Sequence, residues 1–361
     1  MPNDFYKKIL VVNPFGIGDA IFSMYLVEAI KKEWPEAVIG FLGNERTGVL
    51  LGMNRSIDVG HEFNRDEFRS LRQSHFGGFL LKIVELCQKI KKENYDTMFD
   101  LSLGREFSFV AACLGIRRRV GFNFNKRGRW LTHRVKLLAY EKKHVVDWQF
   151  DLLRLLHVEP ARISSKLPLF VSGQAKKNAE EFLIQNGVKN EAGLIAVAPG
   201  GGKSWGPNAV YKQWASSGFA EVIHRYAEGK PATVLILGDS EERPLLEQLK
   251  KALSTPTVVV AGQNLDVVSA LLGRSQFLLC NDGGLLHLAN ALGVKTVSVY
   301  GPVDEKVYGP YGADSSHEML TQDVPCRPCY QKFHFPPCEH QRRCLEQLSV
   351  EKVLAAVKKI S

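Results

Sequence analysis

The chain has 361 residues and a formal charge of +9, with 45% hydrophobic and 24% charged residues. This composition is close to the globular average, which excludes a disordered chain, a collagen and a coiled-coil rod. At roughly 150 residues per domain the length predicts two domains. The excess of 47 Lys and Arg over 38 Asp and Glu favours anionic partners, such as phosphates, acidic lipid headgroups or nucleic acid.

Hydrophobic periodicity in the first half of the chain predicts alternating strands and helices. Short apolar runs predict strands at 8–13, 37–42 and 97–101. Helical spacing predicts helices at 20–32, 79–91 and 147–157. Such alternation is typical of a parallel sheet with helices on both faces.

The pattern weakens between about residues 158 and 173 and then restarts as a second doubly wound unit. The strands predicted there are 194–198, 233–237, 258–260, 277–280 and 295–299. The helices predicted there are 174–185, 210–226, 241–253, 285–292 and 350–360. The chain is therefore predicted to be α/β, with Rossmann-like domains at 1–165 and 173–325 and a cysteine-rich loop and final helix at 326–361. Ligands are expected at the carboxyl ends of the strands, in a cleft between the halves.

The first candidate site is N-P-F-G-I-G-D at 13–19, after the first strand and at the start of the first helix. Gly16 and Gly18 permit a tight turn, and the helix start offers free N–H groups. The dinucleotide fingerprint needs a third glycine where Ile21 stands, which argues against an NAD-linked oxidoreductase. Asp19 is either a helix N-cap or a carboxylate presented as a general base.

The second candidate site is P-G-G-G-K-S-W at 199–205, after a predicted strand. Its glycines suit phosphate oxygens, and Lys203 adds a mobile positive charge. Because Val197 stands where a Walker A loop has its first glycine, this loop is not of that type. A flexible connection is the alternative interpretation.

The third candidate site is N-D-G-G-L-L-H at 281–287, between a predicted strand and the next helix. Gly283 and Gly284 at a helix start form a cradle for an anion. His287 lies one turn further on, where it faces the same ligand, although a lone helical histidine is also a common structural residue.

Two further segments carry unusual composition. Residues 117–144 hold ten Lys or Arg against one acid, with aromatic residues between them, which suits nucleic acid, a phosphorylated acceptor, an acidic membrane or a solvated face. Near the C-terminus, Cys326, Cys329, Cys338 and Cys344 follow a C-x2-C-x8-C-x5-C pattern. Four thiolates suit a structural zinc site, and disulfides or free thiols are the alternatives.

The lack of a recognisable targeting signal predicts a cytoplasmic protein. No apolar run reaches the roughly 18 residues that a membrane span needs. The start of the chain lacks the basic and apolar regions of a secretory signal.

Together these motifs resemble glycosyltransferase family 9, the ADP-heptose:lipopolysaccharide heptosyltransferases and their relatives. The family's G-x-G-D element matches 16–19, and its lysine ahead of a Trp-Pro pair matches Lys203 with Trp205. Its D-[ST]-G-x-x-H element matches 282–287, and its [YF]-G-P-[TV]-D element matches 300–304. The resemblance covers residue 8 to the C-terminus, where a subset of the family has a similar cysteine-rich tail.

The resemblance implies a GT-B fold, with an acceptor domain followed by a nucleotide-sugar domain, and inverting transfer of a heptose or related sugar from ADP-heptose to a lipopolysaccharide core-like acceptor. Asp19 and Lys203 are the implied catalytic residues, and Gly18, Arg118 and Arg119 the implied acceptor-binding residues. The implied donor-binding residues are Gly200, Gly201, Gly202, Trp205, Glu242, Asp282, Gly283, Gly284 and His287. Because no two aspartates stand two residues apart, no cofactor is expected for catalysis. Peripheral contact with the inner face of the cytoplasmic membrane is expected, and binding of nucleic acid is not.

Two departures separate this sequence from the family pattern. Gly283 replaces a Ser or Thr, which removes a hydroxyl that would reach the donor phosphate. Gly206 lengthens the loop between Trp205 and Pro207 by one residue. The alternatives are therefore a GT-B enzyme with another nucleotide sugar, a degenerate transferase, and a non-catalytic protein that binds anions or nucleic acid.

Overall fold

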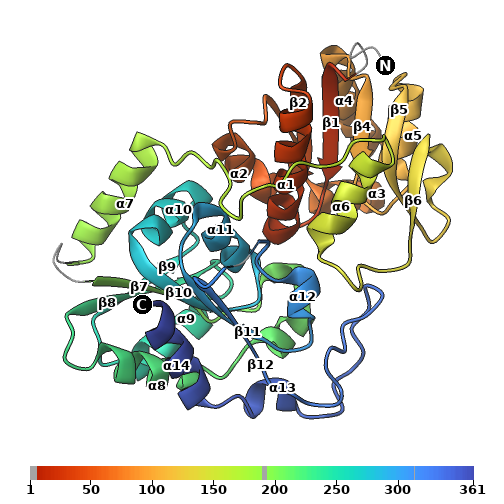
Figure 1. Cartoon of the computed structure of the whole chain (residues 1–361). Coiled ribbons are helices and arrows are strands. Elements are labelled where there is room, and N and C mark those ends of the chain that lie inside the picture. Colours follow the sequence, from red (N-terminus) through yellow and green to blue (C-terminus); the bar gives the residue numbers. More distant parts are fainter. Residues whose placement is uncertain (1–5, 189–192, 313) are drawn as a thin grey trace. The chain divides into compact units, whose positions relative to one another are not determined.

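A computed structural model describes residues 6–188, 193–312 and 314–361, without the side chains of Asp66, Lys203 and Ser204. The chain divides into two compact units, Met1–Ile163 and Ser164–Ser361 (Figure 1). The second unit includes the cysteine-rich segment and the final helix, and each unit carries its own sheet.

The first unit contains a six-stranded parallel sheet in the order β3-β2-β1-β4-β5-β6. Its strands are β1 (Lys8–Asn13), β2 (Val38–Asn44), β3 (Val59–Phe63), β4 (Thr97–Asp100), β5 (Arg118–Phe124) and β6 (His133–Leu137). The apolar β1 lies between β2 and β4, with Ile9 level with both Ile39 and Thr97. The strand order reverses direction between β1 and β4, and ligands of such sheets bind at the carboxyl ends of the strands at this switch point.

Helices and 3-10 turns connect these strands. They are α1 (Ile17–Glu33), η1 (Glu45–Thr47), α2 (Gly48–Met53), α3 (Arg65–Ser74), α4 (Phe76–Glu93), α5 (Glu106–Cys113), η2 (Gly128–Trp130) and α6 (Val145–Arg154). Residues 20–27 of α1 are all buried, because this helix is apolar on nearly every side. The helix therefore holds the 13–19 turn against the core of the unit.

The second unit repeats this topology with the order β12-β11-β10-β7-β8-β9. Its strands are β7 (Gly193–Ala198), β8 (Ala232–Gly238), β9 (Thr257–Ala261), β10 (Ser275–Asn281), β11 (Thr296–Tyr300) and β12 (His317–Thr321). All its strand pairs are parallel, and the switch point lies between β7 and β10. The glycine loop at 199–202 and the 282–284 turn follow these two strands.

The remaining elements of the second unit are α7 (Gly173–Gln185), η3 (Lys203–Lys212), α8 (Ser216–Ala227), α9 (Arg243–Ala252), α10 (Leu265–Arg274), α11 (Gly284–Leu292), α12 (Glu305–Tyr308), α13 (Arg343–Glu346) and α14 (Val350–Ile360). Across the described ranges of both units, no helix combines the length and apolar character needed to cross a bilayer.

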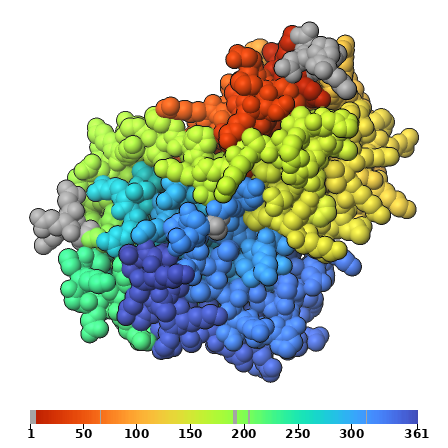
Figure 2. Space-filling model, in the orientation of Figure 1, coloured from red at the N-terminus to blue at the C-terminus, as the bar shows by residue number. Residues whose placement is uncertain are grey.

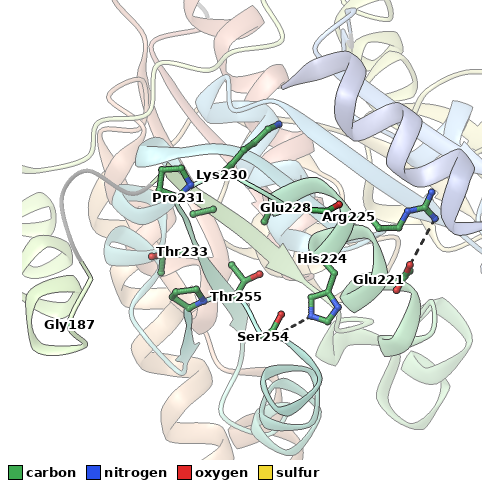
Figure 3. A pocket seen from close by; sticks show the side chains of 13 residues that line it. Gly187, Glu221, His224, Arg225, Glu228, Lys230, Pro231, Thr233, Ser254 and Thr255 are labelled. Carbon is green, nitrogen blue, oxygen red and sulfur yellow. Dashed lines mark hydrogen bonds and ion pairs between the residues drawn. The ribbon is translucent and has the colours of Figure 1, made fainter.

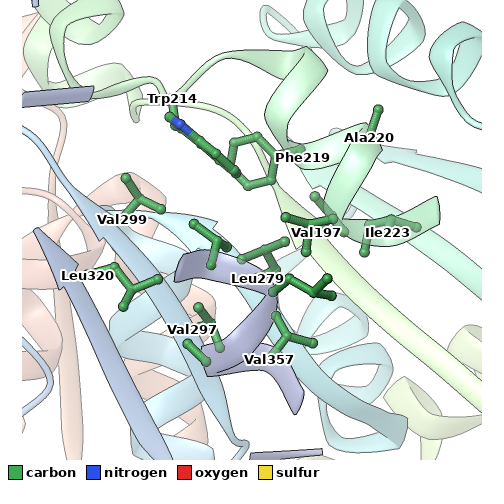
Figure 4. Packing of buried hydrophobic residues seen from close by; sticks show 14 of the residues in the cluster. Val197, Trp214, Phe219, Ala220, Ile223, Leu279, Val297, Val299, Leu320 and Val357 are labelled. Atoms are coloured by element: carbon green, nitrogen blue, oxygen red, sulfur yellow. The ribbon is translucent and has the colours of Figure 1, made fainter. Parts of the chain in front are cut away.

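The core of the second unit extends from the sheet to the end of the chain. Val197, Leu279 and Val297 of neighbouring strands pack with Trp214 and with Val357 of α14 (Figure 4). The apolar face of α14 therefore closes this core.

The α/β class with two parallel sheets is confirmed, and some elements differ from their predictions. The predicted helix 210–226 is too long, because η3 and an extended turn occupy its first residues and α8 begins at Ser216. The strands β3, β5, β6 and β12 were not predicted. In β6 the exposed Arg134 and Lys136 alternate with less exposed residues, so this edge strand lacks a continuous apolar run.

Candidate active site

Three loops of the second unit meet through Asn281, the last residue of β10. Its Nδ2 donates to the carbonyl oxygen of Pro199 at 2.7 Å and to that of Gly200 at 3.3 Å. Its Oδ1 accepts from the backbone N–H of Trp214 at 3.0 Å. A buried amide with its hydrogen bonds satisfied fixes its partners. Asn281 therefore holds the glycine loop and the segment after η3 at the carboxyl end of β10.

The glycine loop lies against Glu242 and the end of η3. A Cβ added to Gly200 would lie 2.0 Å from Oε1 of Glu242. A Cβ added to Gly201 would lie 2.1 Å from the carbonyl oxygen of Ala209, which is backbone and cannot swing aside. Gly202 adopts a φ of +80°, in the left-handed region that favours glycine. Gly201 is thus required by space and Gly202 by conformation, whereas the flexible Glu242 side chain could move away from a side chain at position 200.

Glu242 supports the glycine loop from the carboxyl end of β8. Its Oε2 accepts from the backbone N–H of Asp239 at 3.2 Å, and its carboxylate also accepts from the backbone N–H of Gly202. Burial raises the pKa of Glu242, and these two hydrogen bonds oppose the rise. The structure thus brings Glu242 together with the glycine loop, which is the arrangement expected if both belong to the donor site.

The strongest electrostatic feature of the site is a buried ion pair. Nζ of Lys212 lies 2.7 Å from Oδ2 of Asp282, with side chains 9% and 6% exposed. Nε2 of the buried His287 lies 3.9 Å from Oδ1 of the same aspartate. Charges at this depth are costly unless paired, so the lysine and the aspartate hold each other in place.

An aromatic ring covers the other side of the lysine. Nζ of Lys212 lies 4.8 Å from the centroid of the Trp205 ring, a distance typical of a cation–π contact. Trp205 and Lys212 both belong to η3, which is interrupted at Gly206, where φ is 52° and ψ is −131°. Lys203 begins η3, but its side chain lies outside the described part of the structure, so its catalytic role stays a prediction.

The 282–284 turn has room for a larger side chain. Gly283 is the N-cap of α11 in an extended conformation, with φ 177° and ψ 179°. Among the described residues, nothing lies closer to an added Cβ than the carbonyl oxygen of Asn281 at 4.0 Å. Neither the backbone conformation nor the packing therefore requires glycine here.

In the first unit, Asp19 lies in the first turn of α1, after the carboxyl end of β1. The N-cap of α1 is Gly16, so the interpretation of Asp19 as N-cap is wrong. Nδ2 of the buried Asn13 donates to Oγ of Ser23 at 2.7 Å and to the carbonyl oxygen of Asp19 at 3.1 Å. Asn13 thus fixes the backbone that presents Asp19, together with Gly18.

Two titratable neighbours lie at the same end of this sheet. Tyr140 follows β6, and burial, followed by the charge of Asp19, raises its pKa. At the end of β4, burial raises the pKa of Asp100 to about 6, and hydrogen bonds from Ser102 oppose this rise. Oδ1 of Asp100 accepts from the backbone N–H of Ser102 at 3.0 Å and from its hydroxyl at 2.6 Å.

Arg118 and Arg119 are not brought together with Asp19. They begin β5, level with Thr97 and Met98 at the amino end of β4, whereas Asp19 follows the carboxyl end of β1. Arg119 donates to the carbonyl oxygens of Ile116 and Trp130, which occupies its guanidinium. Arg118 lies over the ring of Tyr6, 5.0 Å from its centroid. Because β5 is parallel to β4 and β1, both arginines lie at the amino ends of these strands, whereas Asp19 follows a carboxyl end; their acceptor role stays a prediction.

The four C-terminal cysteines are electrostatic neighbours. Burial, followed by Cys344, Cys326 and Cys338, raises the pKa of Cys329 to about 11. None of these four residues, all of them in the described part, forms a disulfide. In residues 6–188, 193–312 and 314–361, no group of three or more His, Cys, Asp or Glu side chains is arranged to hold a metal ion. The predicted zinc site therefore stays a prediction.

A separate pocket of about 830 Å³ lies near the amino ends of the strands of the second sheet (Figure 3). Its lining includes Ala232 and Thr233, at the amino end of β8, and His224 of α8. The glycine loop follows the carboxyl end of β7, so this pocket is distinct from the donor-site candidate.

Sequence reasoning missed three residues of the site. Lys212 belongs to a second lysine-x-tryptophan pair, K-Q-W at 212–214, directly before α8, and that spacing was the available signal. Asn13 and Asn281 each end a strand that borders a switch point, and a polar residue closing an apolar run would have identified them.

Comparison with known proteins identifies the family. Residues 83–336 match Glycosyltransferase family 9 (heptosyltransferase). Lipooligosaccharide heptosyltransferase 2 of Campylobacter jejuni subsp. jejuni serotype O:6 (strain 81116 / NCTC 11828) is 26% identical over 359 residues, covering 98% of this chain and 99% of that protein.

Solved structures show the same fold. The glycosyl transferase family 9 protein from Veillonella parvula DSM 2008 has a TM-score of 0.79 at 20% identity, covering 98% of this chain and 97% of that one. E. coli ADP-heptose lps heptosyltransferase II has a TM-score of 0.75 at 20% identity, covering 98% of each chain. The predicted GT-B fold is thereby confirmed. With the family matched over residues 83–336, the chain is a glycosyltransferase and belongs to glycosyltransferase family 9.

Proposed function

We propose that this enzyme transfers a heptose from ADP-heptose to a lipopolysaccharide core-like acceptor with inversion at the anomeric carbon. The observation that carries the donor half is the Lys212–Asp282 ion pair beside the glycine loop. The names of its relatives support the sugar and the acceptor, since they include a lipooligosaccharide heptosyltransferase and an ADP-heptose lps heptosyltransferase.

The donor diphosphate binds at the carboxyl ends of β7 and β10. Backbone N–H groups of Gly200 and Gly201 and the amino end of α11 face its oxygens, and Lys212 supplies a fixed positive charge. As the bond between the anomeric carbon and the phosphate oxygen breaks, negative charge grows on the leaving ADP. Prearranged donors and a buried cation stabilise that charge more than they stabilise the ground state.

The acceptor is activated by Asp19. Its carboxylate takes the proton from the acceptor hydroxyl as that oxygen forms the new bond to the anomeric carbon. ADP leaves with the electron pair of the broken bond. A single displacement from the face opposite the leaving group inverts the anomeric configuration.

Exposed cations around the first sheet suit an anionic acceptor. An exposed Arg or Lys follows the carboxyl end of each of β2, β3, β4, β5 and β6, namely Arg46, Arg65, Arg105, Arg127 and Lys142. Phosphates or carboxylates of the acceptor would bind at these positions. They replace the predicted Arg118 and Arg119 as our candidates for acceptor binding.

The same proposal includes a cytoplasmic location and peripheral contact with the inner, acidic face of the cytoplasmic membrane. Phe109 and Trp130 are exposed, with ring centroids 5.0 Å apart, and Arg129 lies 5.6 Å from the Trp130 centroid. Figure 2 shows residues of this part of the sequence, coloured yellow, at the molecular surface. Aromatic rings next to cations suit the interface of an anionic bilayer. Cosedimentation with vesicles that contain anionic lipid, and not with zwitterionic vesicles, tests this contact.

The transfer is proposed to need no metal ion, because Lys212 supplies positive charge at the leaving group. The test is the formation of heptosylated acceptor and ADP in the presence of excess EDTA, with the product's anomeric configuration read by NMR. Transfer from ADP-heptose with an inverted product is expected. Loss of transfer in EDTA would contradict metal independence, a retained configuration would contradict the single displacement, and transfer only from a UDP or GDP sugar would contradict the donor.

A further inference from the structure

The ring of Trp205 is held by residues far away in the sequence. We define the cysteine segment as residues 322–346, from the end of β12 to the end of α13. Two of its rings contact Trp205: the Tyr330 centroid lies 5.0 Å from the Trp205 centroid, and the Phe335 centroid lies 5.5 Å from it. Phe335 also lies 5.0 Å from Tyr211, the neighbour of Lys212. The segment therefore packs against both aromatic residues of η3.

Two arginines attach the cysteine segment to the unit. Near its start, Nε of Arg327 donates to the carbonyl oxygen of Gly301 at 2.7 Å, and its Nη2 lies 2.5 Å from Oε2 of Glu305. Near its end, Nη1 of Arg342 donates to the carbonyl oxygen of Val210, in η3, at 2.8 Å. These contacts fix the two rings as part of the folded unit.

The backbone that carries Trp205 is bordered by a glycine on each side. Gly202 and Gly206 flank it, and both have positive φ values. Glycines restrict a backbone less than other residues do, so side-chain contacts help to fix the position of the ring. In the described part of the chain, the aromatic rings from outside η3 that contact this ring are those of Tyr330 and Phe335.

We propose that Tyr330 and Phe335 are positioning residues for donor binding: they hold the Trp205 ring against the Lys212 ammonium, which fixes that charge for the donor diphosphate. This inference rests on the proposed function, because it needs Lys212 to bind the diphosphate. Lysine has four rotatable side-chain bonds, and Asp282 restrains its ammonium from one direction only. The ring face at 4.8 Å restrains it from another.

The experiment measures ADP affinity by calorimetry in a double-mutant cycle. Tyr330→Leu removes the ring from Trp205, and the paired change Lys212→Met with Asp282→Asn removes the cation without leaving a buried charge. In the wild-type background, Tyr330→Leu should weaken ADP binding by roughly 3- to 30-fold, the range of a lost cation–π contact. In the paired background, Tyr330→Leu should weaken it no further, because residues that act through one group are not additive.

Three variants keep this test decisive. Tyr330→Phe retains the ring and should bind ADP like the wild type. His334→Ala changes an exposed residue of the same segment and should also bind normally. Phe335→Leu should reproduce the loss and stands in if Tyr330→Leu does not fold.

The outcomes separate the two proposals. The positioning role would be overturned if Tyr330→Leu weakened ADP binding equally in both backgrounds. It would also be overturned if Tyr330→Leu and Phe335→Leu both bound ADP with wild-type affinity. If the wild type itself does not bind ADP, or if the paired change leaves ADP affinity intact, the proposed function fails instead.

Discussion

Nζ of Lys212 and Oδ2 of Asp282 are 2.7 Å apart, although 70 positions separate them in the sequence (282 − 212), and together they join η3 to the turn after β10. Both side chains are nearly inaccessible to water, so each charge depends on the other. Variants that remove one charge or both should therefore show separate effects on the stability of the protein and on its affinity for ADP.

Removing one partner should damage both properties. Lys212→Met leaves Asp282 as an uncompensated buried charge and should lower the free energy of unfolding by about 3–5 kcal/mol. The pair Lys212→Met with Asp282→Asn should recover most of that stability, because neither charge remains. ADP affinity should stay low in both variants. Urea unfolding and calorimetry check the two effects, and an ADP affinity restored in the pair would contradict the role of Lys212.

A hydroxyl at position 283 should strengthen donor binding. The site is extended and spacious among the described residues, so Gly283→Ser fits without strain. The new hydroxyl should tighten ADP binding by roughly 3- to 10-fold, the contribution of one hydrogen bond. It also caps α11, which should stabilise the fold by a few tenths of a kcal/mol, about the difference between Ser and Gly at an N-cap. Gly283→Ala is the matched control, and equal affinities for the Ser and Ala variants would count against a phosphate at this turn.

The close approach of the glycine loop to η3 predicts a different result at position 201. Gly201→Ala places a Cβ 2.1 Å from the backbone carbonyl of Ala209, so the loop must shift. The shift should lower the free energy of unfolding by about 1–3 kcal/mol and weaken ADP binding. Gly173→Ala, where the added Cβ meets no described atom within 4 Å beyond its chain neighbours and its own helix backbone, should weaken neither. Thermal unfolding with and without ADP measures both, and wild-type ADP affinity in Gly201→Ala would mean that this loop does not hold the diphosphate.

The buried Asp100 should make the free energy of unfolding depend on pH. Burial raises its pKa from 3.8 to about 6, so the folded protein keeps this proton at pH values where the unfolded chain has lost it. The group's contribution to stability is therefore present below about pH 4 and declines as the pH rises to about 6, by at most about 3 kcal/mol.

Asp100→Asn should remove this decline, since its amide oxygen still accepts from Ser102. Relative to the wild type, the variant should gain stability between about pH 4 and pH 6, as measured by urea unfolding across that range. Asp323→Asn, at an exposed position of the second unit, should show no such gain. A constant difference between Asp100→Asn and the wild type would show that Asp100 ionises normally in the folded protein.

The sequence allowed the two strand-to-helix junctions to be predicted, because their signals are local. The glycines of 13–19 and 281–287 each follow a short apolar run, and the structure shows β1–α1 and β10–α11 there. Lys212 could not be placed from the sequence, since its partner Asp282 is distant and the hydrophobic spacing around it resembles a helix. Instead η3 is interrupted at Gly206, whose φ and ψ are not helical.

Arg118 and Arg119 show a second limit. The composition of 117–144 identified a basic segment, but without the strand β5 its direction was unknown. The parallel pairing with β4 puts these arginines at the amino end of the sheet. The cysteines show a third limit. Their spacing suits a metal site, but only the arrangement of their side chains in the folded protein decides whether four thiolates can bind one ion.

The most direct test of the proposed chemistry is the rate of heptose transfer from ADP-heptose by Asp19→Asn, measured beside its ADP affinity. Asparagine has the shape of aspartate and cannot accept the acceptor's proton, so transfer should fall by roughly 100-fold or more while ADP affinity stays unchanged. Asp323→Asn serves as the control and should keep both. Transfer at the wild-type rate by Asp19→Asn would contradict the role of Asp19 as the base.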